Sequence, residues 1–137
     1  MTSKHVQRVA ALPLFSGLDT ATLEAVAAVA LPFDAPAGHN LIEPGLVGSG
    51  VFLFEDGQAV LEIHDHTIEI GPGEIVGELA CLDERAVHTG RVHTTTAVRG
   101  LCIRRDEFIA LLETHPAVAV PLLRILAARL VNAIARD

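Results

Sequence analysis

The chain has 137 residues and half of them are hydrophobic, which suits a single domain with its own apolar core. The formal net charge of −7 excludes sequence-independent nucleic-acid binding as the main activity, because that binding depends on Lys and Arg neutralising phosphates. The sequence shows no signal peptide, and its longest uninterrupted apolar stretch, Ala25 to Phe33, is far short of the ~20 residues that cross a bilayer, so we expect a soluble cytoplasmic protein without membrane contact.

Residues 1–31 are expected to be helical. Asp19 is a candidate N-cap, since its carboxylate can accept hydrogen bonds from backbone N–H groups two and three residues later. Four apolar residues then share one helix face at the spacing i, i+3, i+4 and i+7: Leu23, Val26, Ala27 and Ala30.

Residues 32–103 consist of short apolar runs separated by turns. The predicted strands are Leu41–Ile42, Val51–Phe54, Ala59–Ile63, Thr67–Ile70, Val92–Val98 and Leu101–Ile103. Asp56-Gly57 predicts a hairpin turn because this pair accepts a positive φ, and a break between the last two strands is expected near Gly100. Many short strands at this spacing indicate a sandwich, roll or barrel.

Residues 104–137 are expected to be helical again. Asp106 is a candidate cap for a first helix that ends before Pro116, and a last helix is predicted from Ala117 to Ala135. The last helix is apolar over more than one face and therefore needs burial on two sides. We expect the domain's own strands to cover one side and an identical subunit to cover the other, which predicts a homodimer through residues 117–135.

The segment from Gly71 to Leu82 carries the most information about function. A Gly-Pro-Gly turn leads into a two-residue strand, then Gly77, then a short helical turn. Gly77 permits close approach of another backbone or a ligand, and the N–H groups of Glu78, Leu79 and Ala80 would be free to bind an anion. An acidic residue beside an anion is unexpected unless Glu78 reaches sideways to a neutral hydroxyl.

These motifs resemble the cyclic nucleotide-binding domain family over nearly the whole chain. The lead-in Leu12–Leu18, the turn Ala35–Gly38, the cassette Gly71–Ala80 and the helix start Arg105–Phe108 occur in the family's order. The resemblance implies a β-roll, or double-stranded β-helix, with flanking helices (residues 1–31, 32–103 and 104–137 of one domain). It also implies a ligand-sensing regulator, resembling the effector domain of the Crp/Fnr-like proteins without their DNA-binding part.

The resemblance further implies how a ligand is held. The cyclic phosphate sits on the cassette amides, the glutamate takes the ribose 2′-hydroxyl, an arginine pairs with the phosphate, and the last helix closes over the base. The candidate ligand-binding residues are Gly77, Glu78, Leu79, Ala80, Cys81, Arg85, His88 and Thr89. His88 stands where the arginine is expected, and a histidine does not supply a fixed bidentate charge, so the ligand is either cyclic AMP or GMP or another small anion.

Other readings of the same residues remain open. The chain could be a degenerate module that binds no ligand and acts only through its last helix, with Glu78 bonded to a nearby backbone group or to Arg85. A cupin-like metal enzyme would need ligands around His64-Asp65-His66, and a haem sensor would need His88 or Cys81. We expect no enzyme activity, no metal and no cofactor beyond a cyclic nucleotide ligand, and we expect Cys81 and Cys102 to be buried reduced thiols.

Overall fold

The computed structural model describes residues 5–43, 50–63, 66–83 and 90–135. The helices are α1 (Val6–Ala11), α2 (Thr20–Val29), α3 (Glu78–Leu82), α4 (Arg105–Thr114), a 3₁₀ turn (Pro116–Val118) and α5 (Ala119–Ala135). The strands are β1 (Leu31–Ala35), β2 (Asn40–Ile42), β3 (Gly50–Asp56), β4 (Ala59–Ile63), β5 (His66–Ile70), β6 (Ile75–Val76), β7 (Arg91–Thr94) and β8 (Val98–Arg104).

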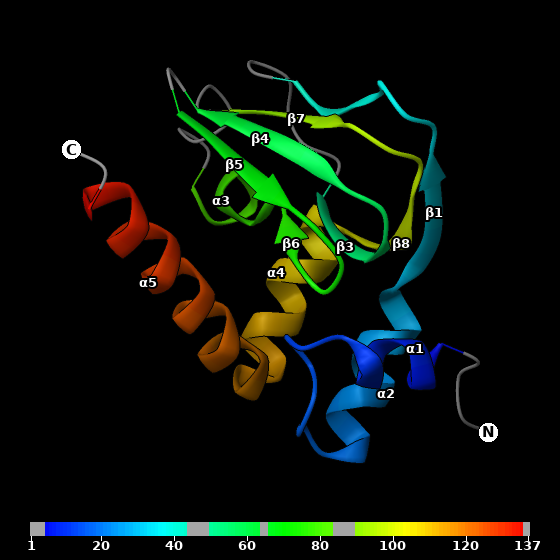
Figure 1. The fold of residues 1–137 in the computed structure, drawn as a ribbon. Coiled ribbons are helices and arrows are strands. Elements are labelled where there is room, and N and C mark those ends of the chain that lie inside the picture. The colour runs from blue at the N-terminus through cyan, green and yellow to red at the C-terminus, as the bar shows by residue number, and fades with distance from the viewer. Residues whose placement is uncertain (1–4, 44–49, 64–65, 84–89, 136–137) are drawn as a thin grey trace.

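The strands form two antiparallel sheets, which confirms the predicted β-roll with flanking helices. One sheet has the order β1-β8-β3-β6 and the other the order β2-β7-β4-β5 (Figure 1). The register of the central pair is fixed by contacts such as Val51 opposite Ile103 and Leu53 opposite Leu101. Helices α1, α2 and α4 lie against the outer side of the first sheet.

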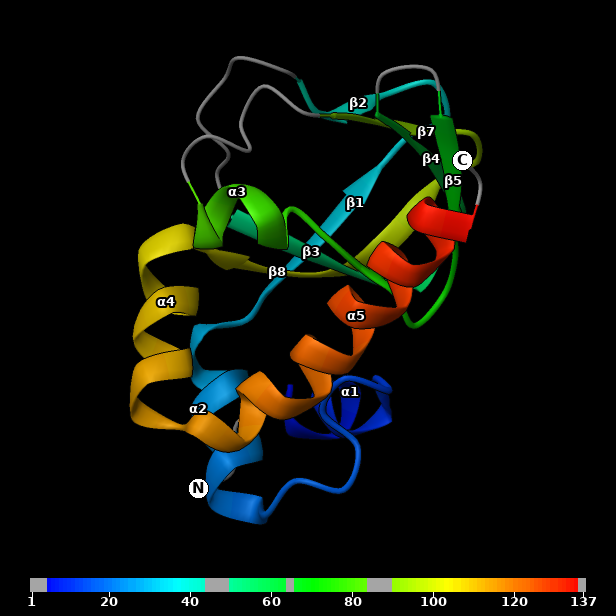
Figure 2. The same cartoon turned by 90° about the vertical axis from the view of Figure 1, so that its left-hand side faces the viewer.

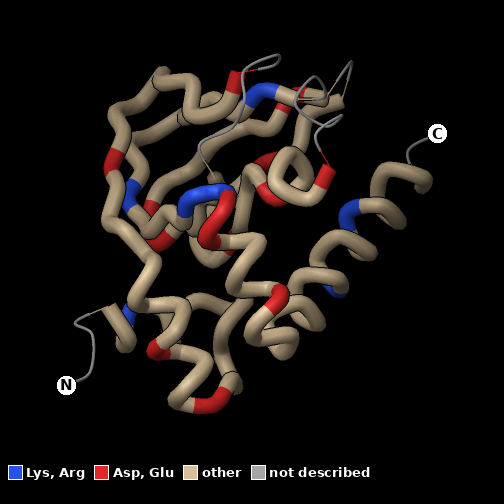
Figure 3. The backbone as a smooth tube through the Cα atoms, turned by 180° about the vertical axis from the view of Figure 1, so that it is seen from behind, with Lys and Arg blue, Asp and Glu red and all other residues tan. Residues whose placement is uncertain are grey.

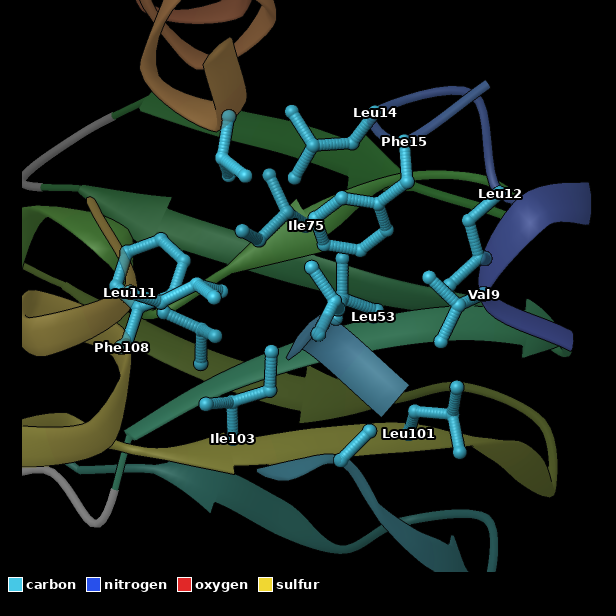
Figure 4. Close-up of a cluster of buried hydrophobic side chains, with 14 of the residues drawn as sticks. Val9, Leu12, Leu14, Phe15, Leu53, Ile75, Leu101, Ile103, Phe108 and Leu111 are labelled. Atoms are coloured by element: carbon cyan, nitrogen blue, oxygen red, sulfur yellow. The ribbon is translucent and has the colours of Figure 1, made fainter. Parts of the chain in front are cut away.

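Strand β3 is buried on both faces because it separates two apolar cores. Phe54 lies in a cluster between the two sheets, together with residues such as Ile70 and Val92. The alternating residues Val51 and Leu53 point the other way, since successive strand side chains face opposite sides of a sheet. This second cluster joins the sheet to the helices (Figure 4), and its labelled members are Val9, Leu12, Leu14, Phe15, Leu53, Ile75, Leu101, Ile103, Phe108 and Leu111.

The element boundaries confirm one predicted cap and correct two other predictions. Asp19 caps α2, and its carboxylate accepts from the Thr22 N–H at 2.8 Å. Asp106 does not cap α4: the N-cap position lies two residues earlier, at Arg104, and the Asp106 carboxylate accepts instead from the adjacent Glu107 N–H. No break occurs at Gly100, because β8 continues through it between β1 and β3, where a Cβ would meet the Leu53 carbonyl.

An ion pair between Arg8 and Glu55 fastens α1 to the end of β3. The Arg8 Nε donates to Glu55 Oε2 at 3.0 Å and a second guanidinium nitrogen bonds the other carboxylate oxygen. The hydrogen bond from Arg8 lowers the pKa of the Glu55 carboxyl despite partial burial. A depressed acid pKa stabilises the fold above the ordinary carboxyl pKa, and that contribution disappears as the pH falls through the lowered value.

We expect Glu55→Gln to lower the free energy of unfolding at pH 7 by roughly 1 kcal/mol, because the pair is partly exposed. The difference between Glu55→Gln and the wild type should shrink as the pH falls below the ordinary carboxyl pKa and through the lowered pKa of Glu55, where Glu55 itself becomes protonated. Urea unfolding at several pH values measures both quantities, with the exposed strand residue Glu69→Gln as a control. A difference that does not change with pH would contradict this assignment.

The last helix uses only one of its faces for packing. Leu122 is its one buried residue, and Ile125 and Leu126 pack partly against the core. Figure 2 shows α5 crossing the side of the roll near β4, β5 and β6. By length and composition alone the stretch Pro116–Ala135 could cross a membrane, but its roll-facing side contains Arg129, whose contacts are described below.

Candidate functional site

A pocket lies where β6 leads into α3. Gly77, between the two elements, has φ +94° and serves as the N-cap of α3. A Cβ at this position would lie 2.5 Å from the Gly50 carbonyl oxygen, so both the backbone conformation and the space require glycine. The cavity volume is small, about 40 Å³, and the pocket is open to solvent. Its walls include the segment Val76–Ala80, apolar residues of β2, β4 and β7, and Arg129.

The amides at the start of α3 are not used in either sheet. Strand pairing in this segment ends at Val76, opposite Phe52. The next backbone bond runs from the Cys81 N–H to the Gly77 carbonyl at 3.4 Å, which closes the first turn. The N–H groups of Glu78, Leu79 and Ala80 therefore precede the helical hydrogen bonds and belong to residues that line the pocket, an arrangement that favours an anion.

Glu78 is a buried acid with one oxygen paired and the other unpaired. The residue is 2% exposed. Its Oε1 accepts from Arg129 Nη1 at 2.6 Å, whereas Oε2 has no hydrogen-bond partner within the described residues. Burial raises the pKa of the Glu78 carboxyl, and the neighbouring Arg129 charge opposes that rise. A buried carboxylate oxygen without a donor is costly, so this geometry favours a ligand that brings a hydroxyl or N–H group.

Arg129 is the functional-site residue that the sequence analysis missed. It lies on α5, and besides Glu78 its guanidinium donates from Nη2 to the Ile75 carbonyl at 2.6 Å and lies 3.8 Å from the Glu74 carboxylate. The sequence signal was its position as one of few charges on a very apolar helix, but 51 residues separate it from Glu78. Figure 3 shows α5 carrying basic but no acidic residues.

A second, mostly apolar pocket lies on the α5 side of Arg129. Its lining comes from β4, β5 and the C-terminal half of α5: Ile63, His66, Ile68, Arg129, Asn132 and Ala133. Ile63 and Arg129 also line the first pocket. The two pockets are therefore neighbours and both are mostly apolar, one at the α3 turn and one beneath the last helix.

The structure brings together some of the predicted site residues and places others elsewhere. Gly77, Glu78, Leu79 and Ala80 line the first pocket. Cys81 lies in the apolar core instead, and burial raises the pKa of its thiol to about 11. The candidates Arg85, His88 and Thr89 lie outside the described residues.

The remaining predictions about reactive side chains concern the cysteines and the histidine pair. Cys81 and Cys102 are both free thiols, although Cys102 is only half-buried. Of the His64-Asp65-His66 sequence, His66 begins β5 and the other two residues lie outside the described part. Among the residues with described placement, no three His, Cys, Asp or Glu side chains gather as a metal-ligand cluster.

Comparisons with known proteins agree with the fold. The family model "Cyclic nucleotide-binding domain" matches residues 32–115. A cyclic nucleotide-gated potassium channel from Rhizobium etli is 32% identical over 118 residues, which cover 85% of this chain and 32% of the channel.

Two solved structures share the architecture. The catabolite activator protein of Thermus thermophilus superposes with a TM-score of 0.76 at 26% identity, over 90% of this chain and 61% of that one. A cAMP-binding acyltransferase from Mycobacterium smegmatis superposes with a TM-score of 0.75 at 30% identity, over 93% of this chain and 41% of that one.

The chain thus spans between about a third and three fifths of the length of these three proteins. These three proteins are a potassium channel, a catabolite activator protein and an acyltransferase, and each is longer than the part that matches this chain. With the family model covering 84 of the 137 residues, and with the roll, the glycine turn and the buried glutamate in place, the chain belongs to the cyclic nucleotide-binding domain family of ligand-sensing regulatory domains.

Proposed function

We propose that this chain binds a cyclic nucleotide, cyclic AMP or cyclic GMP, in the pocket at Gly77–Ala80 and passes the signal on through α5. The observation that carries the proposal is the buried Glu78, whose Oε2 has no donor in the described structure although it borders a pocket. A ribose 2′-hydroxyl supplies the missing donor, and the amides of the first α3 turn suit the cyclic phosphate.

The second pocket supports the same ligand. A purine is flat and largely apolar, which matches the lining from β4, β5 and α5. A nucleotide with its phosphate at α3 and its base beneath α5 would occupy both pockets and contact the last helix. A ligand moves that helix only if it binds one helix position more tightly than another, and direct contact with α5 provides such a difference.

Isothermal titration with cyclic AMP and cyclic GMP tests the proposal. We expect saturable binding of at least one nucleotide, and we expect Glu78→Gln to weaken it by about tenfold or more, since the hydroxyl then loses a charged acceptor. Glu113→Gln, on the exposed side of α4, is the matched control and should bind as the wild type does. Absence of heat from either nucleotide at millimolar concentration would end the proposal.

His88 is proposed as a phosphate partner, because it takes the place of the family's arginine. A histidine carries its charge only below about pH 6.5. The same titration at pH 6 and pH 8 should therefore show tighter binding at pH 6, and equal affinities would exclude His88 from this role.

A second candidate function rests on the exposed side of α5. Large apolar side chains there remain open to solvent, including Leu123, Leu130 and Ile134 at 61–63% exposure. This side favours an interaction module, which would act whether or not the pocket binds a ligand. In either case we propose a regulatory and not a catalytic role, in the cytoplasm, where the free thiols Cys81 and Cys102 stay reduced.

We propose that a second copy of this chain covers the exposed side of α5. The exposed apolar residues repeat with alternating steps of three and four: Val120, Leu123, Ala127, Leu130 and Ile134. This is the seven-residue pattern with which two like helices pair along a seam. A bilayer is a poorer occupant, because the opposite side of the same helix holds Arg129 against Glu78 and so stays fixed to the roll.

A further inference from the structure

Arg129 joins three parts of the candidate site to the last helix. One guanidinium nitrogen donates to the Glu78 carboxylate, and the other donates to the Ile75 carbonyl, each at 2.6 Å. The Glu74 carboxylate, just before β6, lies 3.8 Å away. The side chain of Arg129 is 18% exposed and that of Glu78 only 3%, so this contact is largely shielded from water. Hydrogen bonds from a guanidinium are among the stronger hydrogen bonds in proteins, and here the rigid planar cation bridges two acceptors.

Arg129 could either compete with a ligand for Glu78 or bind Glu78 together with the ligand. The two Glu78 oxygens distinguish these roles, because one is paired with Arg129 and the other is not. If the arginine competed with a ligand, it would occupy both oxygens and a ligand would have to displace it. Only Oε1 is paired, and Oε2 stays buried and without a donor in the described structure. A ligand hydroxyl can therefore bond Oε2 while Arg129 keeps its place, so the geometry favours cooperation over competition.

We propose that Arg129 is a positioning residue of the ligand site: from α5 it orients Glu78 so that Oε2 accepts the ligand hydroxyl, and it thereby makes binding depend on α5 being docked. The proposal rests on the proposed function, since it assumes a ligand with a hydroxyl at Glu78. Coupling of this kind is reciprocal, so a ligand that bonds Oε2 also holds α5 more firmly against the roll.

The first test compares two ligands in two proteins. Cyclic AMP and 2′-deoxy cyclic AMP differ only in the hydroxyl that Glu78 would accept. We expect Arg129→Gln to weaken cyclic AMP binding by about tenfold or more but to change 2′-deoxy cyclic AMP binding by less than about twofold. Arg124→Gln, an exposed arginine of the same helix, should leave both affinities unchanged. An equal loss for the two ligands, or no loss, would overturn the positioning role.

A second measurement needs no variant and follows the helix directly. Hydrogen exchange of the α5 amides in the wild type should slow on binding cyclic AMP and should slow clearly less with 2′-deoxy cyclic AMP at equal saturation. Equal protection by the two ligands would show that α5 does not sense the hydroxyl and would overturn the proposal.

The two proposals fail in different ways. If the wild type binds neither cyclic AMP nor cyclic GMP, the proposed function fails and the role of Arg129 fails with it. If the wild type binds cyclic AMP but Arg129→Gln weakens cyclic AMP and 2′-deoxy cyclic AMP binding equally, only the proposed role of Arg129 is wrong.

Discussion

Gly77→Ala is expected to reduce cyclic nucleotide affinity by roughly a hundredfold, because the amides proposed to hold the phosphate depend on this turn. Gly77 has φ +94°, a conformation that costs an L-residue about 1–2 kcal/mol. The added methyl group would also lie 2.5 Å from the Gly50 carbonyl oxygen, a backbone atom that cannot move away without disturbing β3. The start of α3 must therefore shift, and Glu78 shifts with it.

Gly38→Ala is the matched control for this substitution. Gly38 also has a positive φ, +79°, but a Cβ at that position meets nothing within 4 Å. The Gly38→Ala substitution therefore introduces only the conformational cost of a positive φ. It should lower the free energy of unfolding by about 1–2 kcal/mol without changing ligand affinity. Titration and urea unfolding of both variants separate the two effects. A Gly77→Ala protein that binds as tightly as Gly38→Ala would show that the α3 turn does not hold the ligand.

The local parts of this turn were predictable from the sequence. Glycine and proline mark turns through their own backbone preferences, so Gly71-Pro72-Gly73, the short strand Ile75–Val76 and the bend at Gly77 could be predicted without knowledge of the rest of the chain. The series of short apolar runs separated by turns likewise predicted a sandwich, roll or barrel, and the family resemblance implied the roll. Asp19 could be recognised as a cap because its partner, Thr22, is only three residues away.

The partner of Glu78 could not be predicted in this way. A local reading favoured a neighbouring backbone group or Arg85, because both are close in sequence. The residue that pairs with it, Arg129, comes from α5, and no periodicity within either segment specifies that contact. Gly100 was misread for a similar reason: glycine often breaks a strand, but here it lets β8 lie close to β3, and only the neighbouring strand shows this.

The substitution of Leu123 and Leu130 by Glu is expected to disrupt the proposed dimer and to leave the protein monomeric. Both residues belong to the proposed seam on α5 and are 63% and 61% exposed in the single chain. Burying a leucine in a helix pair contributes about 1.5–3 kcal/mol, and two helices bring two copies of each residue. Replacing them with four like charges facing one another removes that gain and adds repulsion, so the dimer should weaken by at least about a hundredfold.

Light scattering after gel filtration, over a range of protein concentrations, measures the change. Ala128→Glu adds an acid to the same helix at an exposed position outside the seam, and it should remain dimeric. Unchanged helical circular dichroism would show that the double variant is still folded, as expected for substitutions at exposed residues. Because the seam and the Arg129 contact lie on different sides of α5, loss of the dimer should leave the Glu78 pocket intact. A wild type that stays monomeric at high concentration would contradict the proposed dimer.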